Sequence, residues 1–402
     1  MNIVSVSWAD HLAFGEADGR LDTPECVARR AAVWRDELQA EVLHWRVLRT
    51  RLGGRFSAAR GYRHPSLTAA RSIAWDDFAE VPAIAHAAGL EAWLYVSLFD
   101  EGWPLSPARV RARSHHNVMH GQHVAWQSDL TRIHPEWLTV DRTGRIQQTG
   151  VVSLAYPEAR RAFIARWMQL IEPTRFDGLF VCLRSQSRPA DHADQFGFNE
   201  PVRADFRSRH DADLATDDFD LQAWRDLLGD YLTALLVDLR VALQKDSRTL
   251  GVGIARGDVI GPPLGNATLR WRDWVARDLV DHLVVDQNSS QCPSMWHQLW
   301  PMHRGTGYLQ NYLDGSGLPA LPDHLRFTYG TSMEGRAARL FVARQWSDRS
   351  ADTEMQLQSI PGVSGLVFSS FRHDNPQAIQ RGDWRAGRTD QGSGLRAQGG
   401  KS

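Results

Sequence analysis

The stretch FDGLFVCLRSQSRPADHADQFGFNEP, residues 176–201, decides how the rest of the chain is interpreted. It begins with a short, continuous apolar run, which is typical of a strand buried on both faces, as in parallel sheets. The run ends at Arg184 and leads into a charged loop rich in Gly and Asn. Active sites of barrel enzymes lie in the loops that follow such strands. This stretch therefore predicts an enzyme that handles a polar, hydroxyl-rich substrate.

The same pattern recurs along the chain. Strands are expected at residues 2–8, 41–49, 91–99, 179–183, 250–254, 280–286, 340–346 and 365–369, with 325–329 as a candidate partner of the seventh. Helices are expected at residues 24–39, 76–88, 157–170, 221–243 and 271–277. Parallel neighbours need crossover helices, so this alternation predicts an α/β fold, a (β/α)8 TIM barrel. The irregular stretch 100–154 predicts long decorated βα loops.

The length of 402 residues suits one decorated barrel, and a division into two domains is the alternative. We expect a single catalytic barrel over residues 1–384. Residues 385–402 are polar and Gly-rich, so we expect a disordered tail.

Charge and composition exclude several classes of protein. The net charge of −1 is spread evenly, which disfavours a nucleic-acid partner or a polybasic membrane surface. Three cysteines without CxxC spacing indicate neither a disulfide framework nor a Cys-rich zinc site. The start MNIVSVSWADH lacks the features of a signal peptide, and no apolar run is long enough to span a bilayer. We expect a soluble protein, cytoplasmic as the sequence stands and periplasmic or extracellular if a signal peptide once preceded it; the oligomeric state does not follow.

Acidic side chains follow several of the expected strands. Hydrolysis of a glycosidic bond needs two carboxyl groups that flank it. The catalytic candidates by position are Asp286, Glu101, Asp100, Asp194 and Glu200. Structural roles compete with this one: Glu200 would suit the first turn of a helix capped by Asn199, Asp286 could be a cap, and Asp194 could pair with Arg184 or Arg188.

Aromatic, basic and amide side chains at the same strand ends are expected to bind substrate. The 16 Trp exceed the 15 Phe and 7 Tyr, and Trp offers a flat apolar face to a sugar ring, although most of them should fill the core. Several Arg at one site would suit an anionic glycan with sulfate or uronate groups. The candidates are Trp45, Arg46, Trp103, Arg184, Arg256, Asn288, Trp296, His297, Arg344, Trp346, Arg372, His373 and Asp374.

A metal-dependent hydrolase is a further alternative. His115, His116, His120 and His123 lie close together in sequence, and imidazole is a common ligand, but their spacing matches no HExxH pattern. No GxGxxG or P-loop motif is present either. We therefore expect neither a cofactor nor a metal.

Four segments carry a resemblance to a known family: HPEWLTVDRTGR, AYPEARRAFI, RFDGLFVCLRSQ and FGFNEPVRADFRSRH. In these segments the chain resembles bacterial glycoside-hydrolase-like TIM-barrel proteins of the family-10-like group, over about residues 75–300. The resemblance implies a glycosidase acting on an oligo- or polysaccharide. In that group an acid often precedes the residue at Arg184, whereas here Val181, Cys182 and Leu183 do. Because Cys182 cannot replace a carboxylate, the acid must come from the candidates above, or the protein is a non-catalytic carbohydrate-binding pseudoenzyme.

Overall fold

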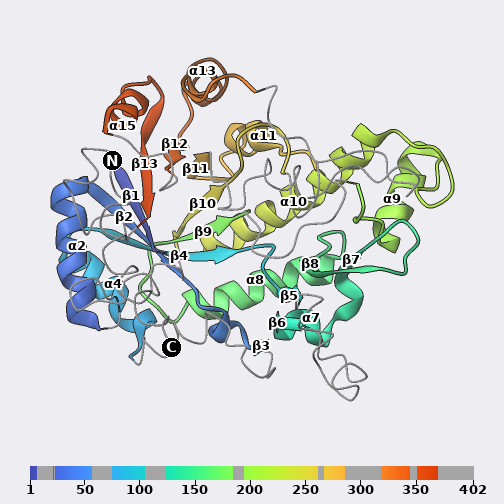
Figure 1. The fold of residues 1–402 in the computed structure, drawn as a ribbon, viewed down its shortest axis with the longest axis horizontal. Helices are drawn as coiled ribbons and strands as arrows, with labels where there is room; N and C mark the ends of the chain where they lie inside the picture. The colour runs from blue at the N-terminus through green and yellow to red at the C-terminus, as the bar shows by residue number, and fades with distance from the viewer. Residues whose placement is uncertain are drawn as a thin grey trace, which may run out of the picture.

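Eight parallel strands form a closed barrel at the centre of the molecule (Figure 1). The structure is a computed structural model, and it describes residues 1–6, 21, 23–56, 75–104, 124–183, 194–260, 267–285, 318–344 and 351–369. In chain order the barrel strands are β1 (Asn2–Val6), β2 (Ala40–Arg46), β4 (Glu91–Ser97), β9 (Gly178–Cys182), β10 (Thr249–Gly253), β11 (His282–Val285), β12 (Arg339–Ala343) and β13 (Val363–Ser369). β1 closes the ring by pairing with both β2 and β13. The prediction of a (β/α)8 barrel is confirmed.

One expected strand is wrong. Residues 325–329 were a candidate partner of β12, but they lie in the π-helix η3 (Leu325–Gly330). β12 already pairs with β11 on one edge and with β13 on the other. It therefore has no free edge for a further strand.

Helices surround the barrel, and several begin at the signals seen in the sequence. Thr23 and Asp220 accept backbone N–H bonds at the starts of α2 and α10, as N-caps do. The helices around the barrel are α2 (Pro24–Leu38), α4 (Asp77–Ala87), α8 (Pro157–Ile171), α9 (Glu200–His210), α10 (Leu221–Gln244), α11 (Trp271–Ala276), α13 (Leu321–His324), α14 (Thr331–Met333) and α15 (Ala351–Gln358). Among the described residues, none of the helices is long and apolar enough to cross a membrane.

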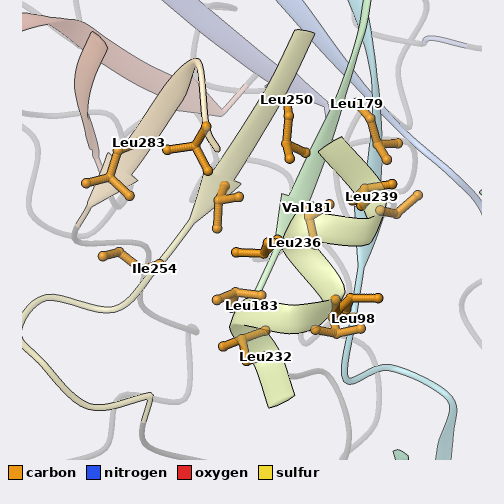
Figure 2. Close-up of a cluster of buried hydrophobic side chains, with 14 of the residues drawn as sticks. Leu98, Leu179, Val181, Leu183, Leu232, Leu236, Leu239, Leu250, Ile254 and Leu283 are labelled. Carbon is orange, nitrogen blue, oxygen red and sulfur yellow. The ribbon is translucent and has the colours of Figure 1, made fainter. Parts of the chain in front are cut away.

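Alternate side chains of the strands point outward to these helices. Figure 2 shows Leu179 and Val181 of β9 and Leu250 of β10 facing Leu236 and Leu239 of α10. All five side chains are fully buried. Since burying a Leu or Val stabilises a fold by about 1.5–3 kcal/mol, this layer fixes the register between strands and helices.

The inward side chains form a stack of rings across the barrel. The ring centroids of His44 and Phe180 are 4.2 Å apart, those of Trp93 and His282 are 4.3 Å apart, and those of His282 and Phe341 are 4.7 Å apart. The closed ring of strands thus encloses two imidazoles among aromatic side chains, in a core that is packed rather than open.

The stretch 100–154 holds more structure than its irregular sequence predicts. It contributes to two small antiparallel sheets, β3 (Arg55–Phe56) with β6 (Val124–Gln127) and β5 (Gly102–Pro104), and β7 (Leu138–Val140) with β8 (Gln147–Val152). The short helices nearby are η1 (Arg49–Leu52), α7 (Asp129–Ile133) and η2 (Pro135–Trp137). A Cβ on Gly150, whose φ is +81°, would lie 2.2 Å from the carbonyl oxygen of Gly102. Only glycine permits this approach, which holds β5 and β8 together just after β4.

Candidate active site

The best-defined polar cluster lies where β2 and β4 end. Arg46 is the last residue of β2 and shares the inward face of Val42 and His44, because strand side chains alternate. Its Nη2 donates to Asp100 Oδ2 at 3.1 Å and to Ser97 Oγ at 2.9 Å. This places a guanidinium group at the carboxyl end of the barrel, where barrel enzymes carry out their chemistry.

Asp100 is held by two guanidinium groups. Besides Arg46, Arg49 of η1 donates from Nε at 3.1 Å and from Nη2 at 2.6 Å. All three side chains are buried. Charge-assisted hydrogen bonds of this kind are strong and fix the position of the carboxylate. The arrangement suits a carboxylate that must be held in a fixed direction, such as a nucleophile or a base.

Glu101 is the next residue but has a different environment. Arg166 of α8 donates to both of its carboxylate oxygens, one bond being 2.9 Å and the other shorter. The Glu101 backbone binds Gly150 of β8 and Ser128, which precedes α7. The side chain has no exposed area. This geometry favours a role in joining α8 to the loop sheets over direct contact with a substrate.

Glu101→Gln tests that interpretation. Removing one partner of a buried ion pair leaves the other charge uncompensated, so we expect the free energy of unfolding to fall by about 3–5 kcal/mol. Chemical denaturation of the variant beside wild type measures this. If Glu101 joins loops and does not touch substrate, turnover per folded molecule should stay near that of wild type; a folded variant without turnover would contradict the structural role.

Asp100, Ser97 and the three arginines line a small crevice at this end of the barrel, which we call the rim crevice. Apolar walls come from Val47, Leu52, Val96 and Trp167. The neighbouring inward positions at the ends of β9 and β10 carry Cys182 and Gly253, which are in register with each other. These two small residues contrast with the aromatic side chains of the layer below.

The other two described acids lie after β9. Asp194 is buried, and its charge acts on Arg225 of α10. Burial lowers the pKa of Arg225, and the negative charge of Asp194 partly opposes this shift. Glu200 opens α9 with a side chain that is 72% exposed and 3.6 Å from Arg203. Its position matches the first-turn role that competed with catalysis. Asn199 makes no cap bond through its side chain, and its amide instead donates to the carbonyl oxygen of Leu138 at 2.8 Å.

Three further described candidates occupy different surroundings. Trp45 points outward from β2, is fully buried, and donates through its ring N–H to Asp77 of α4 at 2.8 Å. Burial raises the pKa of Asp77, although Trp45 and Arg51 oppose this. Arg256 follows β10 and donates to the carbonyl oxygen of Pro319 at 3.0 Å. Arg344 follows β12 and is buried.

The remaining sequence candidates fall outside the described part of the chain, or have side chains that do. They are Asp286, Trp103, Arg184, Asn288, Trp296, His297, Trp346, Arg372, His373 and Asp374, together with His115, His116, His120 and His123. Within the ranges that the structure describes, no three or more His, Cys, Asp or Glu side chains come together in a group that could hold a metal ion.

Sequence reasoning missed Arg49, Arg166 and Ser97. Ser97 lies inside an expected strand, and its hydroxyl gave no signal. Arg49 is the last residue of another expected strand. It could have been predicted from the rule that polar side chains at the carboxyl ends of barrel strands lie close together. Arg166 lies in a helix, and only the tertiary fold brings it to Glu101.

Comparison with known proteins supports the architecture. No protein-family model and no curated protein matches this chain. The glycoside hydrolase domain of PgaB (BpsB) from Bordetella bronchiseptica is 11% identical over 94% of this chain and 97% of its own, with a TM-score of 0.52. The two chains share a fold. At this identity the likeness establishes the barrel and not the activity.

Other solved structures are more distant. A maltogenic α-amylase from Thermotoga neapolitana is 11% identical over 92% of this chain and 68% of its own, with a TM-score of 0.44. A chitinase from Chromobacterium violaceum is 12% identical over 71% and 55%, with a TM-score of 0.29. This chain spans 50–55% of the length of the chitinase chains it matches. These structural neighbours are glycoside hydrolases, as the sequence resemblance implied, but they are too distant to support an argument about the site.

Proposed function

We propose that this protein is a glycoside hydrolase that cleaves a glycosidic bond in an oligo- or polysaccharide at the carboxyl end of its barrel. The observation that carries the proposal is the buried Asp100 carboxylate, held by Arg46 and Arg49 at the exits of two adjacent strands. Paired-carboxylate chemistry needs a carboxylate held in a fixed position beside the bond, and the hydrogen bonds to Asp100 hold it in this way.

The second carboxyl group, which protonates the leaving oxygen, is assigned to Asp286, the residue that directly follows β11. Asp194 is the alternative among the described acids, because it is also buried and lies after β9. Glu200 and Glu101 are less suited, the first being solvent-exposed and paired with Arg203, the second enclosed by Arg166.

Arginine dominates the proposed substrate contacts. Arg46 lies in the site itself, and Arg256 and Arg344 follow two further strands of the barrel. Guanidinium groups bind carboxylate and sulfate bidentately, so an anionic glycan is the substrate that fits them best.

Release of reducing ends from a panel of glycans tests the proposal. The panel pairs neutral and acidic polysaccharides of the same backbone, and we expect cleavage of an acidic member, unaffected by a chelator. Equal cleavage of the neutral and acidic partners would refute the anionic preference. Binding without any product would contradict hydrolysis and identify a carbohydrate-binding pseudoenzyme, and loss of activity on chelation would identify a metal-dependent hydrolase.

A further inference from the structure

Two buried carboxylates bind the same short stretch of chain. The stretch, residues 45–51, contains the end of β2 and the beginning of η1, and we call it the β2–η1 segment. Asp100 binds it through Arg46 and Arg49. The second carboxylate is that of Asp77, the first residue of α4, whose side chain is only 1% exposed. The segment is therefore held at two places, and only one of them belongs to the candidate site.

Both oxygens of the Asp77 carboxylate bind the β2–η1 segment. Oδ2 accepts from the ring N–H of Trp45 at 2.8 Å, and Oδ1 accepts from Nη2 of Arg51. The guanidinium carbon of Arg51 also lies over the ring of Phe78, the next residue of α4, at 4.2 Å from its centroid. Trp45 is fully buried, so its bond is made away from water, where losing it is costly. One carboxylate of α4 thus fixes both ends of the segment.

The residues that bind the two carboxylates alternate along the β2–η1 segment. Trp45 and Arg46 are neighbours in a strand, so their side chains point to opposite faces. Arg49 and Arg51 are two positions apart in a 3-10 helix, which has three residues per turn, so their side chains leave it in different directions. Each arginine of the candidate site therefore lies one or two positions from a residue that α4 holds. A shift of the backbone at either end of the segment would move these arginines.

We propose that Asp77 is a positioning residue for the carboxylate of Asp100. By holding both ends of the β2–η1 segment, it sets the directions from which Arg46 and Arg49 donate to Asp100. Asp77 does not touch the substrate, because it lies with Trp45 on the outer side of β2. The inference rests on the proposed function of Asp100, since misplacing a catalytic group by about 1 Å can lower turnover about 10²-fold. If Asp77 only attached α4 to the barrel, its contribution to stability would be independent of Asp100.

A double-mutant cycle tests whether Asp77 acts through the candidate site. Asp77→Asn and Asp100→Asn are measured singly and together by chemical denaturation. If Asp77 positions the arginines that bind Asp100, part of its effect disappears once Asp100 is replaced. The unfolding equilibrium constant of the double variant should then be about 5-fold smaller than the product of the two single effects, which equals about 1 kcal/mol. Glu101→Gln in place of Asp100→Asn is the matched control, because Arg166 of α8 holds Glu101, and its effect should be additive with that of Asp77→Asn.

A milder variant keeps the test decisive if the double variant does not fold. Arg51→Met removes one of the two side-chain bonds to Asp77, and Arg51 is 36% exposed, so its loss should disturb the core less. All variants are measured at one concentration of sucrose, which is excluded from protein surfaces and favours the folded state. Coupling of Arg51→Met with Asp100→Asn would support the proposal, and additive effects would overturn it.

Kinetics supply the second measurement. On a glycan that the wild type cleaves, Asp77→Asn should lower kcat per folded molecule roughly 10-fold or more, with KM nearly unchanged because Asp77 does not touch the substrate. Additive effects in the cycle, coupling of the same size with Glu101→Gln, or an unchanged kcat would each overturn the positioning role. If the wild type cleaves no glycan, the proposed function fails, whereas the cycle still decides whether Asp77 holds the groups around Asp100.

Discussion

Asp100→Asn should lower the turnover of a cleaved glycan roughly 10²–10⁴-fold, the range expected when a catalytic acid or base is lost. Asparagine keeps the shape of the side chain but cannot carry the negative charge that Arg46 and Arg49 hold in place. The variant should also unfold more easily, by about 3–5 kcal/mol, because two buried guanidinium groups lose their counter-ion. Steady-state kinetics and chemical denaturation of one preparation measure the two effects.

Glu101→Gln is the matched control for Asp100→Asn. Both positions hold buried carboxylates bound by arginine, and they are adjacent in the chain. We expect similar losses of stability from the two variants, but a large loss of turnover only from Asp100→Asn. If both variants lose turnover in proportion to their folded fraction, Asp100 has no catalytic role. Asp286→Asn should match the kinetic loss of Asp100→Asn, and full activity of that variant would move the acid to Asp194.

The barrel could be predicted from the sequence because each strand carries its own local signal. Residues 92–96 and 178–182 carry no alternation of polar side chains, which indicates burial on both faces. The sequence carries no comparable local signal for the π-helix η3. The run LRFTY has β-branched and aromatic residues that suit a strand as well as a helix, and its state depends on β12 having neighbours on both edges.

The site was only partly predictable, since its chemistry depends on pairs far apart in the chain. The rule that residues at strand ends share one end of the barrel correctly predicted that Asp100 and Arg46 lie close together. The same rule could not predict the different roles of Asp100 and Glu101, because these roles depend on which arginine contacts each carboxylate. Trp45 shows the same limit: its place near the end of β2 suggested a substrate contact, yet strand alternation turns it outward to Asp77.

The ring stack inside the barrel should make the protein sensitive to acid. Burial lowers the pKa of His44 well below its usual value, with help from the charge of His282. Burial and Arg339 lower the pKa of His282 to about 4, although Asp281 partly opposes this. Neither ring nitrogen of His44 has a hydrogen-bond partner among the described residues. Protonating His44 would place a charge among Trp93 and Phe180, in a site that is fully buried.

The direction of the pH effect follows from these shifts. Above a pH of about 6.5 both histidines are neutral in the folded and unfolded chains, so they contribute nothing. As the pH falls below that value, the unfolded chain takes up protons that the folded chain refuses, and stability is lost. Each group costs about 1.4 kcal/mol per pH unit, so His282 alone should remove about 3 kcal/mol between pH 6.5 and 4.

Replacing the imidazoles separates this effect from the titration of carboxylates in the same range. His282→Phe keeps a ring in the stack but cannot take up a proton, so its unfolding free energy should fall less steeply than that of wild type between pH 6.5 and 4. His44→Phe should act in the same direction. His210→Phe, at the exposed end of α9, serves as the control and should keep the slope of the wild type. If the curves of wild type and His282→Phe run parallel through this range, His282 is not a cause of the acid sensitivity.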